Sequence, residues 1–239
     1  MEYSIAGILF LGLVIGMQHA LEADHVAAVS SIAVRQSSIR KIITHGAVWG
    51  LGHTITLMLF AGAAVLAGAV ISDGLAGGLE FAVGVMLVGL GINVLWRLWR
   101  DRIHFHAHTH DDGVRHFHAH SHAGETGKHS LRQHEHSHRK AEVRTLLVGM
   151  MHGMAGSAAL LILTATTAPT ATLGFAYVVL FGIGSIAGMA ILSAIIAIPL
   201  SWTARYLTVA HNGLQLTVGC ATAGLGLYVM TTKGMELLA

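Results

Sequence analysis

The sequence predicts an all-α, polytopic membrane protein with six transmembrane helices arranged as a 3+3 inverted repeat. Two observations lead to this fold class. Of the 239 residues, 54% are hydrophobic and only 11% are charged, which lies far outside the range of soluble globular domains. In addition, three consecutive apolar segments of the first half resemble three segments of the second half, in the same order. Because each copy has an odd number of spans, the second copy must enter the membrane from the opposite side.

Six segments are long and apolar enough to cross the hydrocarbon core, which requires about 20 residues. The first is longer than the others and is expected to bend or break near Gly16. The predicted spans cover residues 4–33, 44–71, 76–97, 144–167, 172–200 and 208–231.

The two halves align when the chain is shifted against itself by slightly more than half its length. Chance similarity between glycine-rich apolar helices would explain any one of the matches, but three matches in the same order favour a true repeat. The matching segments are GMQHALEA at 16–23 with GMMHGMAG at 149–156, WGLGH at 49–53 with FGIGS at 181–185, and LEFAVGVMLVGLGINV at 79–94 with LQLTVGCATAGLGLYV at 214–229.

The distribution of basic residues predicts the topology. All of the 14 Lys and Arg residues except Lys233 fall on one side of the predicted spans, and the positive-inside rule makes that side cytoplasmic. We therefore expect a multi-pass protein of the inner cell membrane with both termini outside. Residues 98–143 form a cytoplasmic loop that holds twelve of the eighteen histidines and is expected to be largely disordered unless metal orders it. It separates a first three-helix repeat, residues 1–97, from a second, residues 144–239.

The stretch GMQHALEADH at 16–25 places His19, Glu22, Asp24 and His25 inside an otherwise apolar segment. An ionisable group at membrane depth costs roughly 2.5 kcal/mol or more, so these groups need partners or a cavity. Neighbouring helices could satisfy one such group, but four within seven positions indicate a site for a divalent transition metal. On a straight helix Asp24 would face away from the other three, and His19 and His25 would be separated by about 9 Å of rise. We therefore predict local unwinding around residues 16–25.

Three further histidines are candidate metal ligands. His53 and His45 lie in the second segment, within HGAVWGLGHT, and His53 is the deeper of the two. For His53 the alternative is a neutral imidazole that is hydrogen-bonded to a backbone carbonyl. His152 is the repeat mate of His19, although its half of the chain has AGSAA where the first half has EADHV.

These motifs resemble the nickel/cobalt transporter (NiCoT) family, and in particular its small six-helix, urease-associated members. That family carries H-A-x-D-A-D-H in an early membrane helix, which HALEADH at 19–25 matches with Glu in place of the first Asp. It also carries L-G-H-S/T in the next helix, which LGHT at 51–54 matches. The acidic motif in the second half of larger, eight-helix members is absent here, and the histidine-rich loop resembles that of related efflux proteins. The resemblance implies transport of Ni²⁺ or Co²⁺.

The sequence therefore predicts a metal permease rather than an enzyme, with the ion as cargo and no cofactor. Zn²⁺ and Fe²⁺ are compatible with the same donors. The expected partners are the divalent metal ion and the lipid bilayer, with self-association into a homo-oligomer left open and no nucleic acid. Three alternatives remain at this point: efflux by the same fold, a membrane metalloenzyme, and a metal sensor or storage protein that uses the loop. The proposed metal ligands or pathway residues are His19, Glu22, Asp24, His25, His53, His45 and His152.

Overall fold

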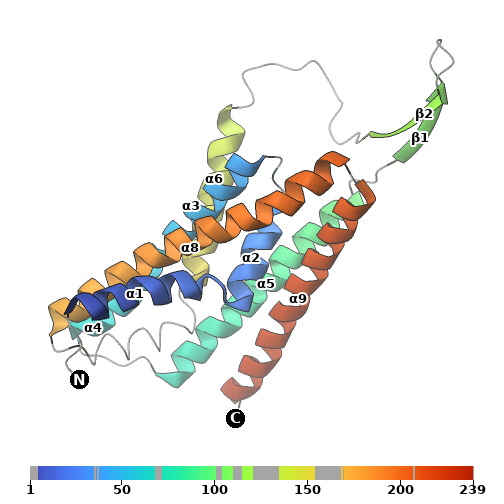
Figure 1. Cartoon of the computed structure of the whole chain (residues 1–239). Helices are drawn as coiled ribbons and strands as arrows, with labels where there is room; N and C mark the ends of the chain where they lie inside the picture. The colour runs from blue at the N-terminus through green and yellow to red at the C-terminus, as the bar shows by residue number, and fades with distance from the viewer. Residues whose placement is uncertain are drawn as a thin grey trace.

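The structure, a computed structural model, describes residues 5–34, 36, 38–67, 72–100, 104–109, 115–120, 135–153, 168, 170–206 and 208–238. These residues form helices and one two-stranded hairpin (Figure 1). The elements are α1 (Ile5–His19), α2 (Ala23–Ala33), α3 (Ile39–Leu57), the π-helical turn η1 (Met58–Gly62), α4 (Ala63–Ala67), α5 (Asp73–Arg100), β1 (His104–Thr109), β2 (Arg115–His120), α6 (Glu135–His152), α8 (Ala171–Tyr206) and α9 (Thr208–Leu238).

Several helices are long and apolar enough to span a membrane, which makes the chain a polytopic helical membrane protein. Within the described residues four helical stretches meet this criterion, and the bent pair of α1 and α2 adds a fifth as one broken span. The fourth predicted segment, 144–167, is described only as far as Gly153, where α6 has just ended, and its remainder lies outside the described residues. The candidate spans are Ile39–Gly62, Gly74–Arg100, Ala171–Thr203 and Val209–Leu237.

The structure departs from an all-α chain at the hairpin of β1 and β2, which lies in the histidine-rich loop. That loop was expected to be largely disordered. Along both strands histidine occurs at every second position, and this period of two is that of a β-strand rather than of a helix. The spacing of the histidines in this loop therefore favours local strand pairing.

The helices pack in pairs around the short helix α2. α1 lies along α8, α3 lies between α8 and α6, and α5 and α9 run side by side over most of their length (Figure 1). α2 contacts α3, α5, α8 and α9. Residues that follow the break in the first span are thus placed in the middle of the helical assembly.

Glycine allows the closest of these helix contacts. A β-carbon at Gly16 of α1 would overlap the carbonyl oxygen of Phe181 in α8, and a β-carbon at Gly149 of α6 would overlap that of Trp49 in α3. Small residues at such crossings let the two backbones approach, which is how helices associate in lipid. The positions of His19 and His152, each three residues after one of these glycines, are fixed by the same contacts.

The pair of α5 and α9 is built in the same way. A β-carbon at Gly91 would lie 2.7 Å from the carbonyl oxygen of Gly219, and one at Gly226 would lie 2.7 Å from that of Gly84. Near the other end of the pair, Nζ of Lys233 lies 3.1 Å from a carboxylate oxygen of Glu80. These contacts hold α5 and α9 together as one unit beside α2.

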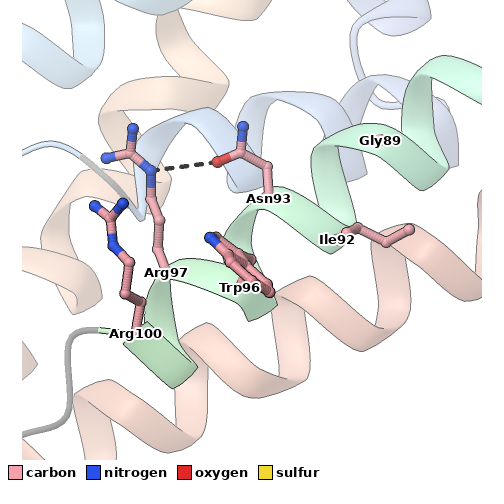
Figure 2. Close-up of a pocket in the computed structure, with 6 residues that line it drawn as sticks. All are labelled: Gly89, Ile92, Asn93, Trp96, Arg97 and Arg100. Carbon is pink, nitrogen blue, oxygen red and sulfur yellow. Dashed lines mark hydrogen bonds between the residues drawn. The ribbon is translucent and has the colours of Figure 1, made fainter.

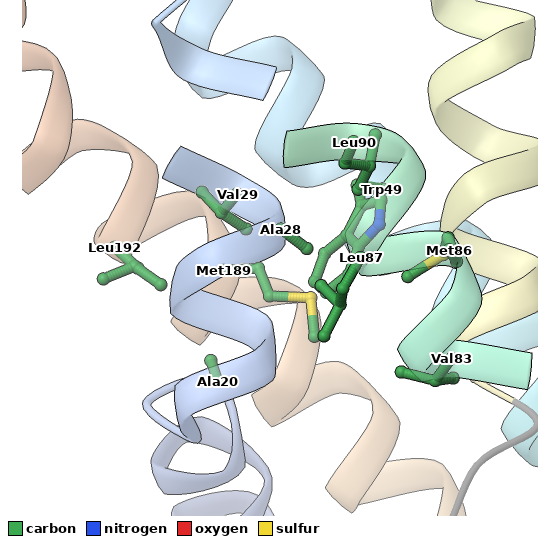
Figure 3. Close-up of a cluster of buried hydrophobic side chains, with 10 residues drawn as sticks. All are labelled: Ala20, Ala28, Val29, Trp49, Val83, Met86, Leu87, Leu90, Met189 and Leu192. Atoms are coloured by element: carbon green, nitrogen blue, oxygen red, sulfur yellow. The ribbon is translucent and has the colours of Figure 1, made fainter. Parts of the chain in front are cut away.

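Buried apolar side chains surround α2, and large apolar side chains elsewhere face outwards. Trp49, Leu87 and Met189 are fully buried where α2, α3, α5 and α8 meet (Figure 3). By contrast Phe10 and Ile198 are about two-thirds exposed, at 65% and 66%. Exposed apolar surface of this kind suits helices that contact lipid. The cluster in Figure 3 comprises Ala20, Ala28, Val29, Trp49, Val83, Met86, Leu87, Leu90, Met189 and Leu192.

Candidate metal centre

The first span is broken where the histidines begin. α1 ends at His19, and α2 begins after a short turn with its axis bent by 57°. In that turn the N–H of Leu21 donates to the carbonyl of Gln18 (2.9 Å) and the N–H of Glu22 donates to that of His19 (3.1 Å). The predicted local unwinding is confirmed. Because of the bend, the ring centroids of His19 and His25 are 4.2 Å apart, whereas a straight helix would separate the two residues by about 9 Å of rise.

Four buried histidines from four helices meet beside this break. His19 ends α1, His25 lies in α2, His53 lies in α3 and His152 ends α6, and none is more than 4% exposed. Nε2 of His19 is 3.3 Å from Nε2 of His53. The ring centroid of His25 is 5.0 Å from that of His53 and 4.4 Å from that of His152. Imidazole nitrogens bind zinc at about 2.0–2.1 Å. The Nε2 atoms of His19 and His53, 3.3 Å apart, are therefore close enough to bind the same ion.

Asp24 connects two of these histidines. Its Oδ1 lies 2.9 Å from Nδ1 of His25, and its Oδ2 lies 3.1 Å from Nε2 of His152. On a straight helix Asp24 would point away from the other three groups, and it reaches the histidines because α2 starts at a new angle and His152 approaches from α6.

Glu22 lies at the edge of the cluster. Its Oε1 is 2.7 Å from Nδ1 of His19, and its side chain is 50% exposed. A carboxylate that accepts a hydrogen bond from one ring nitrogen of a histidine fixes the tautomer and the orientation of that ring. The geometry of Glu22 is that of a group that orients His19.

Two overlapping sets of donor atoms could hold an ion. In each set the three donor atoms lie within 4.8 Å of one another, and His25 belongs to both. Nε2 of His25, Nδ1 of His53 and Nδ1 of His152 are buried and have no hydrogen-bond partner among the residues that the structure describes. Leaving such an atom unpaired costs free energy, and an ion bound to it would remove that cost. The sets are His19, His25 and His53, and Asp24, His25 and His152.

Aromatic rings enclose the cluster, and the sequence interpretation missed them. Trp49 is fully buried, with its ring centroid 5.4 Å from that of His25 and 5.0 Å from that of His152. Phe181 of α8 packs 5.2 Å from His19. The signal for Trp49 was its position four residues before His53, which places both on one face of α3.

A buried serine in α8 was also missed. Ser185 is fully buried, and its Oγ has no hydrogen-bond partner within the described part of the chain. It lies one helical turn after Phe181, the residue that packs on His19. The alignment of WGLGH with FGIGS pairs it with His53, and this was the available signal.

His45, the remaining predicted ligand, lies apart from the cluster. It is buried in α3, two turns before His53, and its Nδ1 is 2.8 Å from Oγ1 of Thr145 in α6. It belongs to neither donor set found among the described residues. Of the seven predicted residues, the structure thus brings together five histidine and aspartate side chains, sets Glu22 behind His19 and leaves His45 at the α3–α6 contact.

A groove of about 330 Å³ follows the last turns of α5 (Figure 2). Within it Nε of Arg97 donates to Oδ1 of Asn93 at 3.2 Å. All of its lining residues come from one helix, and none belongs to the histidine cluster, so the groove is not part of the metal centre. The lining residues are Gly89, Ile92, Asn93, Trp96, Arg97 and Arg100.

Comparison with known proteins identifies the family. No protein-family model matches the chain, and no solved structure matches it. The urease accessory protein UreH of Bacillus sp. (strain TB-90) is 32% identical over 236 residues, which is 98% of this chain and 95% of the relative. The match spans both halves and the loop, and so extends well beyond the two motifs. The chain therefore belongs to the family of the urease accessory protein UreH, the urease-associated group of the nickel/cobalt transporters that its motifs resemble.

Proposed function

We propose that the protein is a membrane permease that moves a divalent transition metal, Ni²⁺ or Co²⁺, through the cluster of His19, Asp24, His25, His53 and His152. One observation carries the proposal: four histidines and a carboxylate from four helices converge in the interior of a membrane protein. Three of the histidines, His25, His53 and His152, each have a buried ring nitrogen with no partner among the described residues. Polar groups at such a depth are costly unless they serve an ion or substrate path.

The donor atoms favour a first-row transition metal. Imidazole suits nickel, cobalt, zinc and iron, whereas Mg²⁺ and Ca²⁺ prefer sites made of oxygen. The carboxylate of Asp24 offsets part of the double charge, and Glu22 holds His19 in the orientation that ligation needs. The relative serves urease as an accessory protein, and supply of nickel fits that role.

The packing of the helices supports an inverted repeat of residues 1–97 and 144–239. Gly16 meets the carbonyl of Phe181, and Gly149 meets that of Trp49. In the alignment of the two halves, Gly149 is the repeat mate of Gly16 and Phe181 is the repeat mate of Trp49. The contact of α1 with α8 is therefore repeated, with the halves exchanged, in the contact of α6 with α3.

The pair of α5 and α9 carries the same relation, because Gly84 aligns with Gly219 and Gly91 aligns with Gly226. If each residue is replaced by its repeat mate, the contact of Gly91 with Gly219 becomes the contact of Gly226 with Gly84. In both contacts, a β-carbon at the first glycine would lie 2.7 Å from the carbonyl oxygen of the second. Two equivalent interfaces on either side of a central site allow the site to open alternately to each side, by rocking of one repeat against the other.

The position of the aromatic and basic residues at the end of α5 supports a cytoplasmic loop. Trp96 and Trp99 pack with their ring centroids 5.3 Å apart, next to Arg97 and Arg100. Tryptophan is enriched at the interface of the membrane, and Arg at its cytoplasmic face. With three spans in each half, a cytoplasmic loop would leave both termini outside.

Flux measurements in proteoliposomes test the proposal. The purified protein is reconstituted around a dye that Ni²⁺ quenches, and we expect Ni²⁺ entry to fall to the rate of empty vesicles for His19→Ala, Asp24→Asn and His25→Ala. His211→Ala is the matched control, because His211 lies in α9 and bonds Gln215 and Thr203 outside the cluster. Wild-type flux in all three cluster variants would refute the proposed site.

Deleting residues 104–138 separates the permease from a sensor or storage protein. If the protein senses or stores metal through the loop, the deletion should abolish that activity. If it transports Ni²⁺ through the membrane cluster, the deletion should leave the Ni²⁺ flux intact. Vesicles of known orientation then distinguish uptake from efflux, because the two directions load opposite compartments.

A further inference from the structure

The groove along the last turns of α5 changes in chemical character from one end to the other. Its lining residues are spaced three or four positions apart, so they form one stripe along a face of the helix. The stripe begins with apolar residues, continues with an amide and an indole, and ends with two guanidinium groups. In order along α5 the residues are Gly89, Ile92, Asn93, Trp96, Arg97 and Arg100 (Figure 2).

The cationic end of the groove is suited to an anion. Nε of Arg97 donates to Oδ1 of Asn93 at 3.2 Å, and this bond uses only one of the five N–H groups of the guanidinium. Within the described part of the chain, no carboxylate forms an ion pair with Arg97 or Arg100. Because a guanidinium can bind two phosphate oxygens at once, a phosphate group is the anion that this pair matches best.

The other end of the groove is apolar and open. A β-carbon at Gly89 would meet nothing within 4 Å, and Ile92 is 55% exposed. Gly89 lies about 12 Å along the helix axis from Arg97, and the hydrocarbon of one leaflet is about 15 Å deep. The apolar end therefore lies among acyl chains when the arginines lie at the level of the headgroups.

Two tryptophans place the cationic end at the surface of the membrane. Trp96 and Trp99 are 56% and 61% exposed, and their ring centroids are 5.3 Å apart. Tryptophan is enriched where the hydrocarbon meets the headgroups. The two arginines are thus within reach of lipid phosphates, while Gly89 and Ile92 remain within the span Gly74–Arg100.

We propose that this groove is a binding site for an anionic phospholipid, whose phosphate lies on Arg97 and Arg100 and whose acyl chain lies along Ile92 and Gly89. The groups of such a lipid follow one another in the same order as the residues of the stripe. Two cations without an acidic partner among the described residues favour a lipid of net negative charge, such as phosphatidylglycerol, over a zwitterionic one. Basic pockets at the cytoplasmic face of membrane proteins bind headgroups of this kind.

The size of the groove and its distance from the metal ligands fit this role. Its volume of about 330 Å³ lies at the lower end of the range for small-molecule sites, about 300–1,000 Å³. A free phosphate would bind the arginines but would leave the apolar end uncovered. Since no lining residue belongs to the histidine cluster, the lipid site does not depend on the proposed metal transport.

Native mass spectrometry of the full-length protein in detergent tests the cationic end, with phosphatidylglycerol and phosphatidylcholine as the added lipids. The wild type should bind phosphatidylglycerol more tightly. Replacing both arginines, by Arg97→Gln with Arg100→Gln, should weaken its binding about 30-fold, because each basic residue near an anionic lipid contributes about a factor of five. Arg40→Gln with Lys41→Gln is the matched control, because it removes the same charge from exposed positions of α3 outside the groove. Equal losses in the two double variants would mean that net charge alone attracts the lipid, and would overturn the proposal.

A change without any effect on charge tests the apolar end. Gly89→Leu should fill the groove and weaken the binding of phosphatidylglycerol, whereas Gly224→Leu, at another glycine whose β-carbon would meet nothing within 4 Å, should bind like the wild type. Circular dichroism checks that both variants keep their helices. An excess of inorganic phosphate should not displace the lipid from the wild type. Displacement by phosphate, or wild-type affinity in Gly89→Leu, would mean that the groove recognises phosphate alone and would refute the lipid site.

Discussion

Glu22 gives the sharpest prediction about the membrane cluster, because its carboxylate contacts His19 from the edge of the cluster. Its Oε1 lies 2.7 Å from Nδ1 of His19, while its side chain remains 50% exposed. A group that orients a ligand typically accounts for 10–100-fold in metal affinity. We therefore expect Glu22→Ala to weaken Ni²⁺ binding by about that factor, which corresponds to about 1.4–2.7 kcal/mol.

Glu22→Gln separates an orienting role from direct ligation. The amide oxygen of Gln still accepts a hydrogen bond from Nδ1 of His19, although a bond to a neutral group is roughly half as strong as one to a carboxylate. The Gln variant should thus retain much of the affinity that the Ala variant loses. A carboxylate that bound the ion itself would make the two variants equally weak.

The assay is competition between the purified protein and a chromophoric chelator for Ni²⁺, with Glu80→Gln as the matched control. Glu80 bonds Lys233 between α5 and α9 and lies outside the cluster, so its replacement should leave the affinity unchanged. If Glu22→Ala binds Ni²⁺ as tightly as the wild type, the reasoning about His19 is refuted.

Three further predictions concern packing and the limits of the site. Gly149→Ala should lower Tm, because its β-carbon would overlap the carbonyl of Trp49 and such overpacking costs about 1–3 kcal/mol; Gly224→Ala, whose β-carbon would meet nothing within 4 Å, should not. Trp49→Ala should cost about 3–5 kcal/mol of stability, as measured by thermal unfolding, and should also weaken Ni²⁺ binding, since the ring packs on three of the histidines. His45→Ala should leave Ni²⁺ affinity at the cluster unchanged and lower stability by about 1 kcal/mol through loss of its bond to Thr145. A marked loss of affinity in that variant would place His45 on the ion path.

Much of this arrangement could be predicted from the sequence. Long apolar segments located the membrane helices found among the described residues, and the distance between His19 and His25 on a straight helix predicted a break between them. The helices themselves run further than the predicted spans at several ends: α5 reaches Arg100 and α9 reaches Leu238, because backbone hydrogen bonding continues where charged residues interrupt the apolar sequence. The π-helical turn at Met58–Gly62 had no signal in the pattern.

The parts that could not be predicted depend on how helices cross. The bond from Asp24 to His152 joins residues 128 positions apart, and helical periodicity within one segment carries no information about such a pair. For Trp49 the sequence shows only that it shares a face of α3 with His53, and its packing on His25 and His152 depends on how the helices cross. The alternation of histidines in the loop is visible in the sequence, but composition alone does not indicate a strand, and the pairing of β1 with β2 followed only from the structure.

The most direct test of the metal centre is anomalous scattering from crystals of the protein grown with Ni²⁺, measured at the nickel absorption edge. An ion carried by the cluster should give a peak between the imidazoles of His19, His25 and His53, or between Asp24, His25 and His152. Crystals in which nickel occupies other sites while both of these positions stay empty would contradict the account.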